Sequence, residues 1–349
     1  MACLGCAWAP TSPLHSRPLR QRHHRPALPA RVAPARATLR GEPSRGIADA
    51  AAGTGLEVRD GEEVNKAIVG FYDNSATAWE RLFGNHMHHG FYEPGATPSL
   101  SDHRPALSRM VEESLALAGV SDDPLEKPKR IVDVGCGIGG GTVYLAKTLG
   151  VQCDGVNISS VQIAKARAHA VAEGLDDKVT FHVADAAKQP FPDGHFDLVW
   201  CMETAEHVPN KRKFMKELVR VAAPGATIVI TGLFHRELLP GEDSLRPDEQ
   251  KVLRKISDAF HHGSWFSCAD YVEVAKSLSL QDIKTADWSD NISPFWPSVI
   301  SSFLSWEGIG LILQGGWTVI YSIIMAPTMI EAFEKKVIKY QIITCQKPR

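Results

Sequence analysis

Five glycines follow a short apolar stretch at residues 131–141, and this feature constrains the fold of the chain more than any other. The sequence there is Ile-Val-Asp-Val-Gly-Cys-Gly-Ile-Gly-Gly-Gly. Glycine lacks a Cβ atom, so a ligand can approach its backbone closely. A helix that starts in such a loop also turns unpaired N–H groups toward the ligand. The pattern predicts a nucleotide-binding turn between a strand and a helix.

Strands and helices alternate along the chain from about residue 129. Seven apolar stretches have the length and pattern of strands, at 130–134, 151–158, 178–184, 196–203, 226–232, 281–288 and 339–347. This alternation is typical of parallel βαβ units in an α/β, doubly wound, Rossmann-like sheet. Ligands of such sheets bind at the carboxyl ends of the strands, where the glycine loop lies.

The segments outside this alternation are predicted to cover the site. Residues 61–120 have the pattern of an N-terminal helical lid that includes an irregular Gly- and His-rich stretch. Residues 121–349 form the predicted ligand-binding domain. Within it we expect an inserted helical cap over the substrate, at about 233–280 and 295–335.

An unusually apolar stretch occupies residues 308–330 and is long enough to span a bilayer. It contains four glycines, Gln314 and Pro327, and Glu307 and Glu331 flank it. These residues favour apolar helices that wall a pocket or touch a membrane surface over a transmembrane helix.

The first 41 residues hold seven arginines and six prolines but no Asp or Glu. An acid-free, Arg-rich leader is typical of organelle transit peptides. Frequent prolines disfavour an amphipathic helix and so favour a chloroplast over a mitochondrial address. We therefore expect residues 1–50 to be a disordered transit peptide; the alternative is a basic tail that targets nothing.

Charge and cysteine content exclude some function classes. The net charge of −2 gives no reason to expect nucleic acid as a partner. Seven cysteines in 349 residues are too sparse for a disulfide framework, which suits a reducing compartment. The His-Met-His-His run at 86–89 lacks a nearby carboxylate or cysteine to complete a metal site, so no metal is expected.

Asp133 distinguishes between the two ligands that the glycine loop could hold. A dinucleotide would place its pyrophosphate there, and a carboxylate just before the loop would repel it. The same carboxylate would suit the α-ammonium of S-adenosylmethionine (SAM). The other interpretation of Asp133 is an acid that only caps the loop.

Polar residues also follow the later strands. Asn157 ends the second strand, where ribose hydroxyls need a partner, and Asp185 with Ala186 ends the third, near the expected adenine. Glu203, Glu206 and His207 come just after the fourth strand and are expected to face the reacting centre, with Glu203 in contact with the cofactor. The alternatives are a turn-forming Asp185 and a helix cap at residues 206–207.

Several segments resemble known enzymes. VDVGCGIGG, VADAAKQPFPDGHFDLVW and VAAPGATIVI resemble the three motifs of class I SAM-dependent methyltransferases. GNHMHHGFYEP, SLRPDEQ, ADWSDNISPFWPSVI and IITCQKP are similar to plant γ-tocopherol methyltransferases and their relatives, over about residues 61–347. The resemblance implies the seven-stranded SAM methyltransferase fold.

The resemblance also implies roles for individual residues. Tyr72 resembles the tyrosine that closes over SAM. The positions that match the loop, ribose and adenine sides of the SAM site are Gly135, Gly137, Asn157, Gln162, Asp185 and Ala186. Gly139 of the glycine loop is also expected to bind the cofactor. The chain departs from the family pattern at Asn85, at 142–144 and at 232–235. These departures concern the acceptor rather than SAM, and relatives with this outline include alkaloid N-methyltransferases.

Methyl transfer to a phenol ring needs a base, because a phenol with a pKa near 10 is mostly protonated at neutral pH. The candidate bases are His88, His89, His207 and His235, of which His207 and His88 rank first; Glu206 is the third predicted catalytic residue. The alternative is that these histidines only hold the lid. Four aromatic residues are expected to receive a prenyl tail: Phe295, Trp296, Trp306 and Trp317.

The sequence thus predicts a chloroplast SAM-dependent C-methyltransferase that converts γ- and δ-tocopherol to α- and β-tocopherol, at the inner envelope or a plastoglobule surface. One alternative is an N-methyltransferase of the same fold that acts on an alkaloid or another amine. A second is a nicotinamide-dependent dehydrogenase, and a third is a paralogue that binds SAM without catalysis.

Overall fold

The computed structural model describes residues 54, 56, 61–303, 320, 321 and 323–349. The predicted leader and the tryptophans at 306 and 317 lie outside these residues. The strands are β1 Arg130–Val134, β2 Gln152–Asn157, β3 Val179–Val183, β4 Phe196–Met202, β5 Ala222–His235, β6 Gln281–Asp287 and β7 Ile338–Gln346. The helices are α1 Gly61–Phe83, α2 Leu100–Ala118, α3 Gly140–Leu149, α4 Ser160–Ala172, α5 Lys211–Val221, α6 Pro247–Phe260, α7 Cys268–Ser277, α8 Ser289–Ile292 and α9 Phe295–Phe303. Residues 323–334 are also helical.

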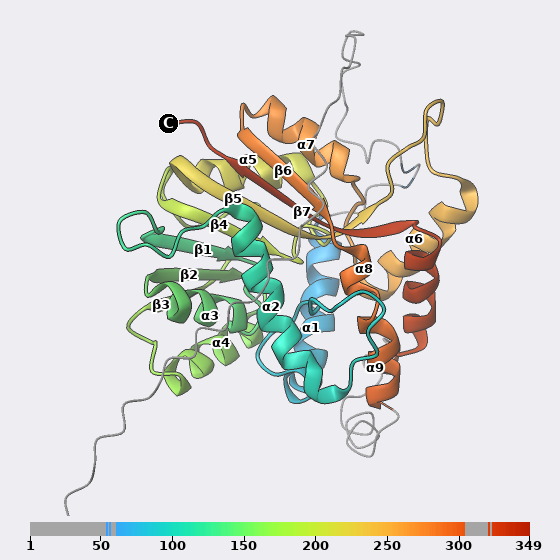
Figure 1. The fold of residues 1–349 in the computed structure, drawn as a ribbon, viewed down its shortest axis with the longest axis horizontal. Coiled ribbons are helices and arrows are strands. Elements are labelled where there is room, and N and C mark those ends of the chain that lie inside the picture. The colour runs from blue at the N-terminus through green and yellow to red at the C-terminus, as the bar shows by residue number, and fades with distance from the viewer. Residues whose placement is uncertain (1–53, 55, 57–60, 304–319, 322) are drawn as a thin grey trace, which may run out of the picture. The chain divides into compact units, whose positions relative to one another are not determined.

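The sheet has seven strands in the order β3-β2-β1-β4-β5-β7-β6 (Figure 1). Strands β1 to β5 pair in parallel, and β7 inserts antiparallel between β5 and β6. The strand order reverses between β1 and β4, which is where a doubly wound sheet opens a crevice for a ligand. The predicted fold class is confirmed.

Helices cover both faces of the sheet (Figure 1). Helices α2, α3 and α4 contribute to one apolar core, which includes Leu107, Leu145 and Ile163. Helices α5 and α7 contribute to the other, which includes Phe214 and Val274. Both cores are built from the alternating apolar residues of the strands, so the sheet forms a rigid base for the loops at its carboxyl edge.

Two helices that we expected over the site instead pack on the sheet. Helix α2, which belongs to the predicted lid 61–120, contacts β5 and β7. Helix α7 contacts β6 and β7 and lies in the same layer as α5. Strand β5 also extends to His235, because its pairing with β7 continues as far as Ile338.

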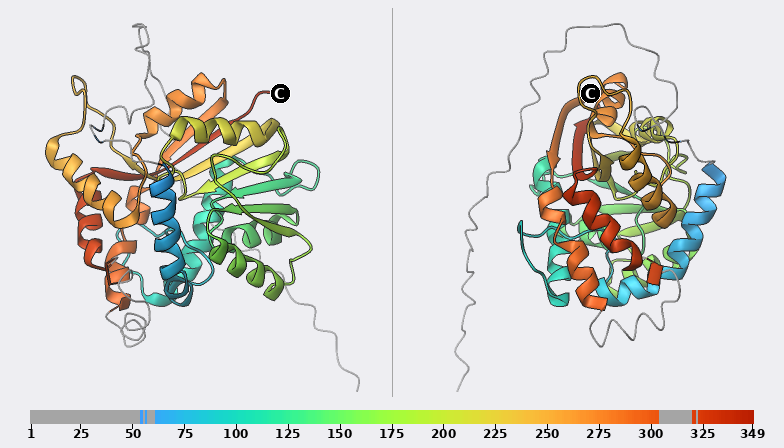
Figure 2. Two further views of the ribbon diagram at one scale, coloured as in Figure 1. Left: turned by 180° about the vertical axis from the view of Figure 1, so that it is seen from behind. Right: turned by 90° about the vertical axis from the view of Figure 1, so that its right-hand side faces the viewer.

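Helix α1 runs across the carboxyl ends of the parallel strands (Figure 2). It begins with Glu62 and Glu63 in its first turn, as the helix dipole favours, and contacts α4. Among the described residues, no helix combines the length and apolar character needed to cross a membrane. Most of the apolar stretch 308–330 lies outside those residues.

Candidate functional site

The candidate site is a cavity at the carboxyl ends of β1 to β4, beneath α1, with a volume of about 440 Å³. It is lined by the loops that follow these strands and by the N-terminal lid. Eleven of the thirteen site residues predicted from the sequence line it: Tyr72, His88, Asp133, Gly135, Gly137, Asn157, Gln162, Asp185, Ala186, Glu203 and His207. The parallel strands bring these residues together although they span more than a hundred positions.

The glycines after β1 have distinct structural reasons. Gly135 has φ +87°, and a Cβ there would overlap the Thr204 side chain. A Cβ on Gly140 would overlap the backbone carbonyl of Asn85, so this glycine lets the lid close onto the start of α3. The loop is therefore bare partly because two protein segments, and not only a ligand, approach it.

Gly139 is a correction to the sequence prediction. It does not line the cavity. It has φ +85°, and a Cβ there would lie 2.8 Å from the Ala166 Cβ and 2.9 Å from the Phe181 ring. Its lack of a side chain allows α3, α4 and β3 to pack closely, and it contributes no surface to the site.

Asp133 lies at the floor of the cavity and is 4% exposed. The Thr142 hydroxyl donates a hydrogen bond to its carboxylate over 2.7 Å. Burial raises the pKa of Asp133 to about 6, and the Thr142 hydrogen bond acts in the opposite direction. A cationic ligand group beside this carboxylate would favour its charged form.

The loops after β2 and β3 hold their polar side chains in a hydrogen-bonded arrangement. Asn157 donates to the Gln162 side chain over 2.7 Å. Asp185 accepts from the Ala187 amide at 2.7 Å and from the Asn65 side chain at 3.4 Å. Asn65 comes from α1 and was not predicted, because nothing in the helical pattern separates it from a solvated polar residue.

A second, smaller cavity of about 90 Å³ adjoins the first. Five residues line both cavities and form the wall between them: Tyr72, Met87, His88, Glu203 and His207. The remaining wall of the second cavity is largely aromatic and apolar: Phe71, Trp79, Leu233, Phe260, Phe295, Trp296 and Met329. The predicted positions Phe295 and Trp296 thus lie in a pocket next to the glycine loop.

The two histidines ranked first as bases have occupied ring nitrogens. The Tyr72 hydroxyl donates to His207 Nε2 over 2.9 Å, and His207 Nδ1 faces the His261 carbonyl at 3.5 Å. His88 Nδ1 donates to the His89 carbonyl at 2.9 Å, so His88 Nε2 accepts from His86 Nδ1 at 3.0 Å. Burial is the main cause that lowers the pKa of His207, to about 4, and it also lowers the pKa of His88.

His89 forms a hydrogen-bonded pair with Glu203 that the sequence did not reveal. His89 Nδ1 lies 2.7 Å from Glu203 Oε2, and the His89 amide donates to Oε1 over 2.7 Å. The Tyr340 hydroxyl from β7 donates to Oε1 as well, over 2.8 Å. Burial opposes the charge of Glu203, but its contacts with His89 lower the pKa of the carboxyl below its usual range.

Glu206 lines only the second cavity. Burial, and then the charge of Glu203, raise the pKa of this carboxyl. The neighbouring Lys211 is 2% exposed and donates to the carbonyls of Ala205, Glu206 and Val208. Lys211 therefore holds the turn that carries Glu206 and His207.

His235 is the second correction. It is 1% exposed and lines neither cavity. Its Nδ1 donates to the Arg236 carbonyl at 2.6 Å, and its Nε2 lies 3.6 Å from Asp270 of α7. Its side chain therefore lies beside α7 and outside both cavities, where it cannot serve as a base at the site.

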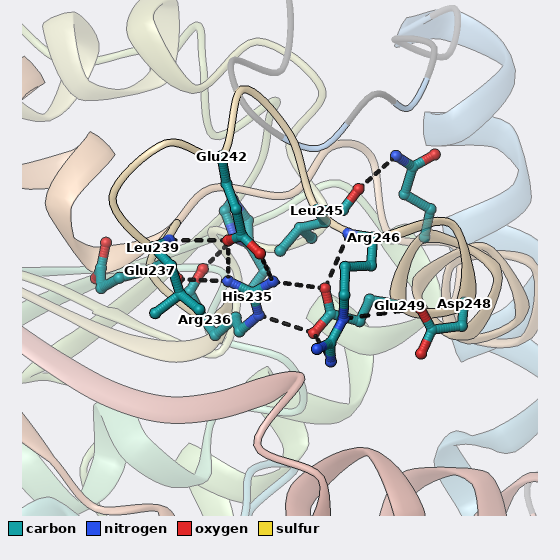
Figure 3. A network of polar contacts seen from close by, with 10 residues as sticks. His235, Arg236, Glu237, Leu239, Glu242, Leu245, Arg246, Asp248 and Glu249 are labelled. Atoms are coloured by element: carbon teal, nitrogen blue, oxygen red, sulfur yellow. Dashed lines mark hydrogen bonds and ion pairs between the residues drawn. The ribbon is translucent and has the colours of Figure 1, made fainter.

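A charged network anchors the segment after β5 (Figure 3). The Arg236 guanidinium donates to both oxygens of Glu242 and of Glu249, over 2.6–2.9 Å. Arg246 donates to Glu249 as well, over 2.8 Å. Paired bidentate contacts of this kind fix geometry, so the network holds α6 and the aromatic residues at its end over the second cavity.

No group of three His, Cys, Asp or Glu side chains within the described part of the chain is arranged to hold a metal ion. The site is therefore built from hydrogen-bonding groups and aromatic surface. The site consists of two adjoining cavities. The larger one lies beside Asp133 at the end of β1, and the smaller one is lined largely by aromatic side chains.

Comparisons with known proteins agree with this geometry. A family profile described as a methyltransferase domain matches residues 132–230. The chain is 54% identical to the probable chloroplastic tocopherol O-methyltransferase of Oryza sativa subsp. japonica, over 82% of this chain and 79% of that protein. It is 50% identical to the chloroplastic tocopherol O-methyltransferase of Arabidopsis thaliana, over 86% of each.

A further relative is named as an N-methyltransferase. The norajmaline N-methyltransferase of Rauvolfia serpentina is 44% identical over 82% of this chain and 99% of that protein. Among solved structures, the [4+2]-cyclase SpnF matches with a TM-score of 0.67 at 22% identity, over 84% of this chain and 99% of that one. A geranyl diphosphate methyltransferase in complex with geranyl diphosphate and sinefungin matches with a TM-score of 0.64 at 18% identity, over 81% and 99%. At such identities these structures speak for the fold alone.

Proposed function

The chain belongs to the family of SAM-dependent methyltransferases that includes the tocopherol O-methyltransferases, and we propose that it methylates γ- and δ-tocopherol to α- and β-tocopherol in the chloroplast. Family membership confirms the predicted enzyme class and SAM as the methyl donor. The observation that carries the proposal is the pair of cavities that share one wall, next to the glycine loop and lined by aromatic residues.

The larger cavity is the proposed SAM site. Asp133 would face the ammonium group of SAM. Burial disfavours the charged form of its carboxylate, and a cation beside it would stabilise that form. Asn157 and Gln162 would bind the ribose, and Asp185 the adenine amino group. Tyr72 on α1 would close the cavity from the lid side. SAM supplies a methyl group activated by its sulfonium.

The smaller cavity is the proposed acceptor site. Its aromatic wall would hold the chromanol ring, while apolar surface next to it would receive the prenyl tail, at roughly 0.8 kcal/mol for each buried CH₂. The shared wall would hold the acceptor carbon in line with the methyl group. Much of the rate of such a displacement comes from this alignment.

The target carbon is the ring carbon beside the phenolic hydroxyl. Conversion of γ- to α-tocopherol adds a ring methyl group, whereas the names of the relatives describe transfer to oxygen. The product methylated at carbon and the product methylated at oxygen have the same mass, but their new methyl groups differ in the nuclear magnetic resonance spectrum. Carbon transfer also leaves the phenol free, which oxygen transfer does not.

We also propose where the enzyme works. Residues 1–50 would act as the transit peptide, because they are Arg-rich and acid-free. The apolar stretch 308–330 would contact the inner envelope or a plastoglobule, where a prenylated substrate dissolves. Import of the labelled precursor into isolated chloroplasts, followed by separation of envelope and plastoglobule fractions, tests both statements.

An amine acceptor is the second candidate function, because the norajmaline N-methyltransferase matches along 99% of its length. The test incubates the full chain with methyl-labelled SAM and, separately, γ-tocopherol, δ-tocopherol and a panel of indole alkaloids. We expect a ring-methylated tocopherol, identified by mass and by nuclear magnetic resonance of the new methyl group. Turnover of amines alone would refute the proposal, and a methyl ether would refute carbon as the target.

A further inference from the structure

Three buried polar atoms that lack a hydrogen-bond partner among the described residues belong to side chains that line the smaller cavity. They are His89 Nε2, Glu206 Oε2 and Trp296 Nε1. Buried polar atoms are nearly always paired in folded proteins, because an unpaired one keeps the full cost of its desolvation. The cavity is therefore built to receive a polar group, such as a hydroxyl, that both donates and accepts.

We propose that His89 is the base that takes the phenolic proton of the acceptor and that Glu203 is the positioning residue that orients it. This inference rests on the proposed phenol methylation. It differs from the sequence ranking, which placed His207 and His88 first. Glu203, which we expected to touch the cofactor, acts here through His89.

The hydrogen bonds of His89 determine which ring nitrogen is free. Its Nδ1 lies 2.7 Å from Glu203 Oε2, and a carboxylate can only accept, so the proton resides on Nδ1. The lone pair of Nε2 is then left without a donor among the described residues. A carboxylate that orients a histidine in this way also stabilises the imidazolium once the proton arrives.

The other histidines of the wall lack this arrangement. His207 Nε2 already accepts from the Tyr72 hydroxyl at 2.9 Å. His88 uses both nitrogens, on the His89 carbonyl and on His86. Either residue would have to break an existing hydrogen bond before it could accept a proton from the acceptor.

Several contacts fix the position of the Glu203 side chain. Besides the two bonds from His89, the Tyr340 hydroxyl donates to it over 2.8 Å. Its backbone has φ +52°, a left-handed conformation that residues other than glycine rarely adopt and that is concentrated at functional sites. The His89 ring is further confined by Phe295 at 4.6 Å and Trp296 at 5.6 Å between ring centroids.

His89 Nε2 takes the phenolic proton, and the electron pair of the oxygen moves into the ring. The ring carbon forms a bond to the methyl group while the carbon–sulfur bond breaks and its electron pair stays on sulfur. The ring proton then leaves to water, and His89 returns its proton to the oxygen. One proton is released for each methyl group transferred.

The test measures kcat, KM for γ-tocopherol and SAM affinity in the full-length enzyme with His89→Asn. Asparagine keeps a donor for Glu203 but has no basic nitrogen at the Nε2 position. General-base catalysis contributes about 100-fold to 10,000-fold, so we expect kcat to fall at least 100-fold. SAM affinity should change less than threefold. His89→Gln is the second variant and should lose turnover to the same extent.

Two further measurements separate a base from a structural residue. Added imidazole should restore part of the kcat of His89→Ala, because a diffusible base can replace the ring. Glu203→Gln should lower kcat tenfold or more with little change in KM, and Glu203→Asp should recover part of it. The matched control is His182→Asn, which removes a histidine bonded to Asp154 over 2.7 Å outside both cavities and should leave kcat unchanged.

Turnover retained within threefold by His89→Asn or His89→Gln would overturn the inference. So would a full loss caused by His88→Asn or His207→Asn while the His89 variants stay active. If wild-type enzyme forms no ring-methylated tocopherol, the proposed function itself fails. If it forms that product and the His89 variants do as well, only the assignment of the base fails.

Discussion

Replacement of Asp133 by asparagine should stabilise the SAM-free enzyme and weaken its binding of SAM. The carboxyl is 4% exposed, and the Thr142 hydroxyl donates to it over 2.7 Å. Asparagine has the same shape and its carbonyl oxygen can accept the same hydrogen bond. The substitution therefore removes the buried charge and little else.

The size of the effect follows from the pKa. Burial raises the pKa of Asp133 from 3.8 to about 6. Since one pKa unit corresponds to about 1.4 kcal/mol, the charged carboxylate costs about 3 kcal/mol of folding stability at neutral pH. Below about pH 4 the carboxyl is neutral in both the folded and the unfolded state, and the cost vanishes. It grows as the pH rises and is complete above about pH 6.

The assay compares thermal unfolding of wild type and Asp133→Asn without SAM. At pH 7.5 we expect the variant to melt roughly 6 °C higher or more, since 1 kcal/mol shifts the melting point of a domain of this size by about 2–4 °C. At pH 5 the gain should fall to about half. Titration calorimetry should show SAM affinity reduced about tenfold or more, because a charge-assisted contact is lost.

The result that would refute this reasoning is an Asp133→Asn enzyme with unchanged SAM affinity and an unchanged or lower melting point. The carboxyl would then serve only Thr142 and the loop. Asp154→Asn is the control: this residue lies on the neighbouring strand β2, outside the cavity, and its replacement should leave SAM affinity unchanged.

Two more substitutions test the lid and the turn after β4. Gly140→Ala should weaken SAM binding about tenfold, because its Cβ would push the lid carbonyl of Asn85 away. Gly70→Ala on α1 has open space around its Cβ and should have a smaller effect. Calorimetric titration compares them, and equal affinities would contradict the lid contact. Lys211→Met should lower the free energy of unfolding in urea by about 3 kcal/mol, because three carbonyls lose their buried donor. The exposed Lys216→Met should change it by less than about 0.5 kcal/mol, and an equally small change in Lys211→Met would exclude the proposed role in the turn.

Several features followed from local patterns in the sequence. Apolar stretches alternate with helical ones, so the parallel sheet and its strand ends could be predicted. Parallel strands end at the same edge, and this rule alone brought Asp133, Asn157, Asp185 and Glu203 to one cavity. The prediction erred for Gly139, whose close neighbours come from α4 and β3 rather than from a ligand.

Only the tertiary structure decided which histidine can accept a proton. His89 and Glu203 are 114 positions apart in the chain, and Tyr340 is 137 positions from Glu203. A neutral imidazole is a base only at the nitrogen that no donor already occupies, and this depends on contacts between distant segments. Sequence by itself thus determined the strands, the glycine turn and the acids at the strand ends, because each arises from residues close in the chain. The free nitrogen, the antiparallel insertion of β7 and the wall between the cavities depend on how those segments pack.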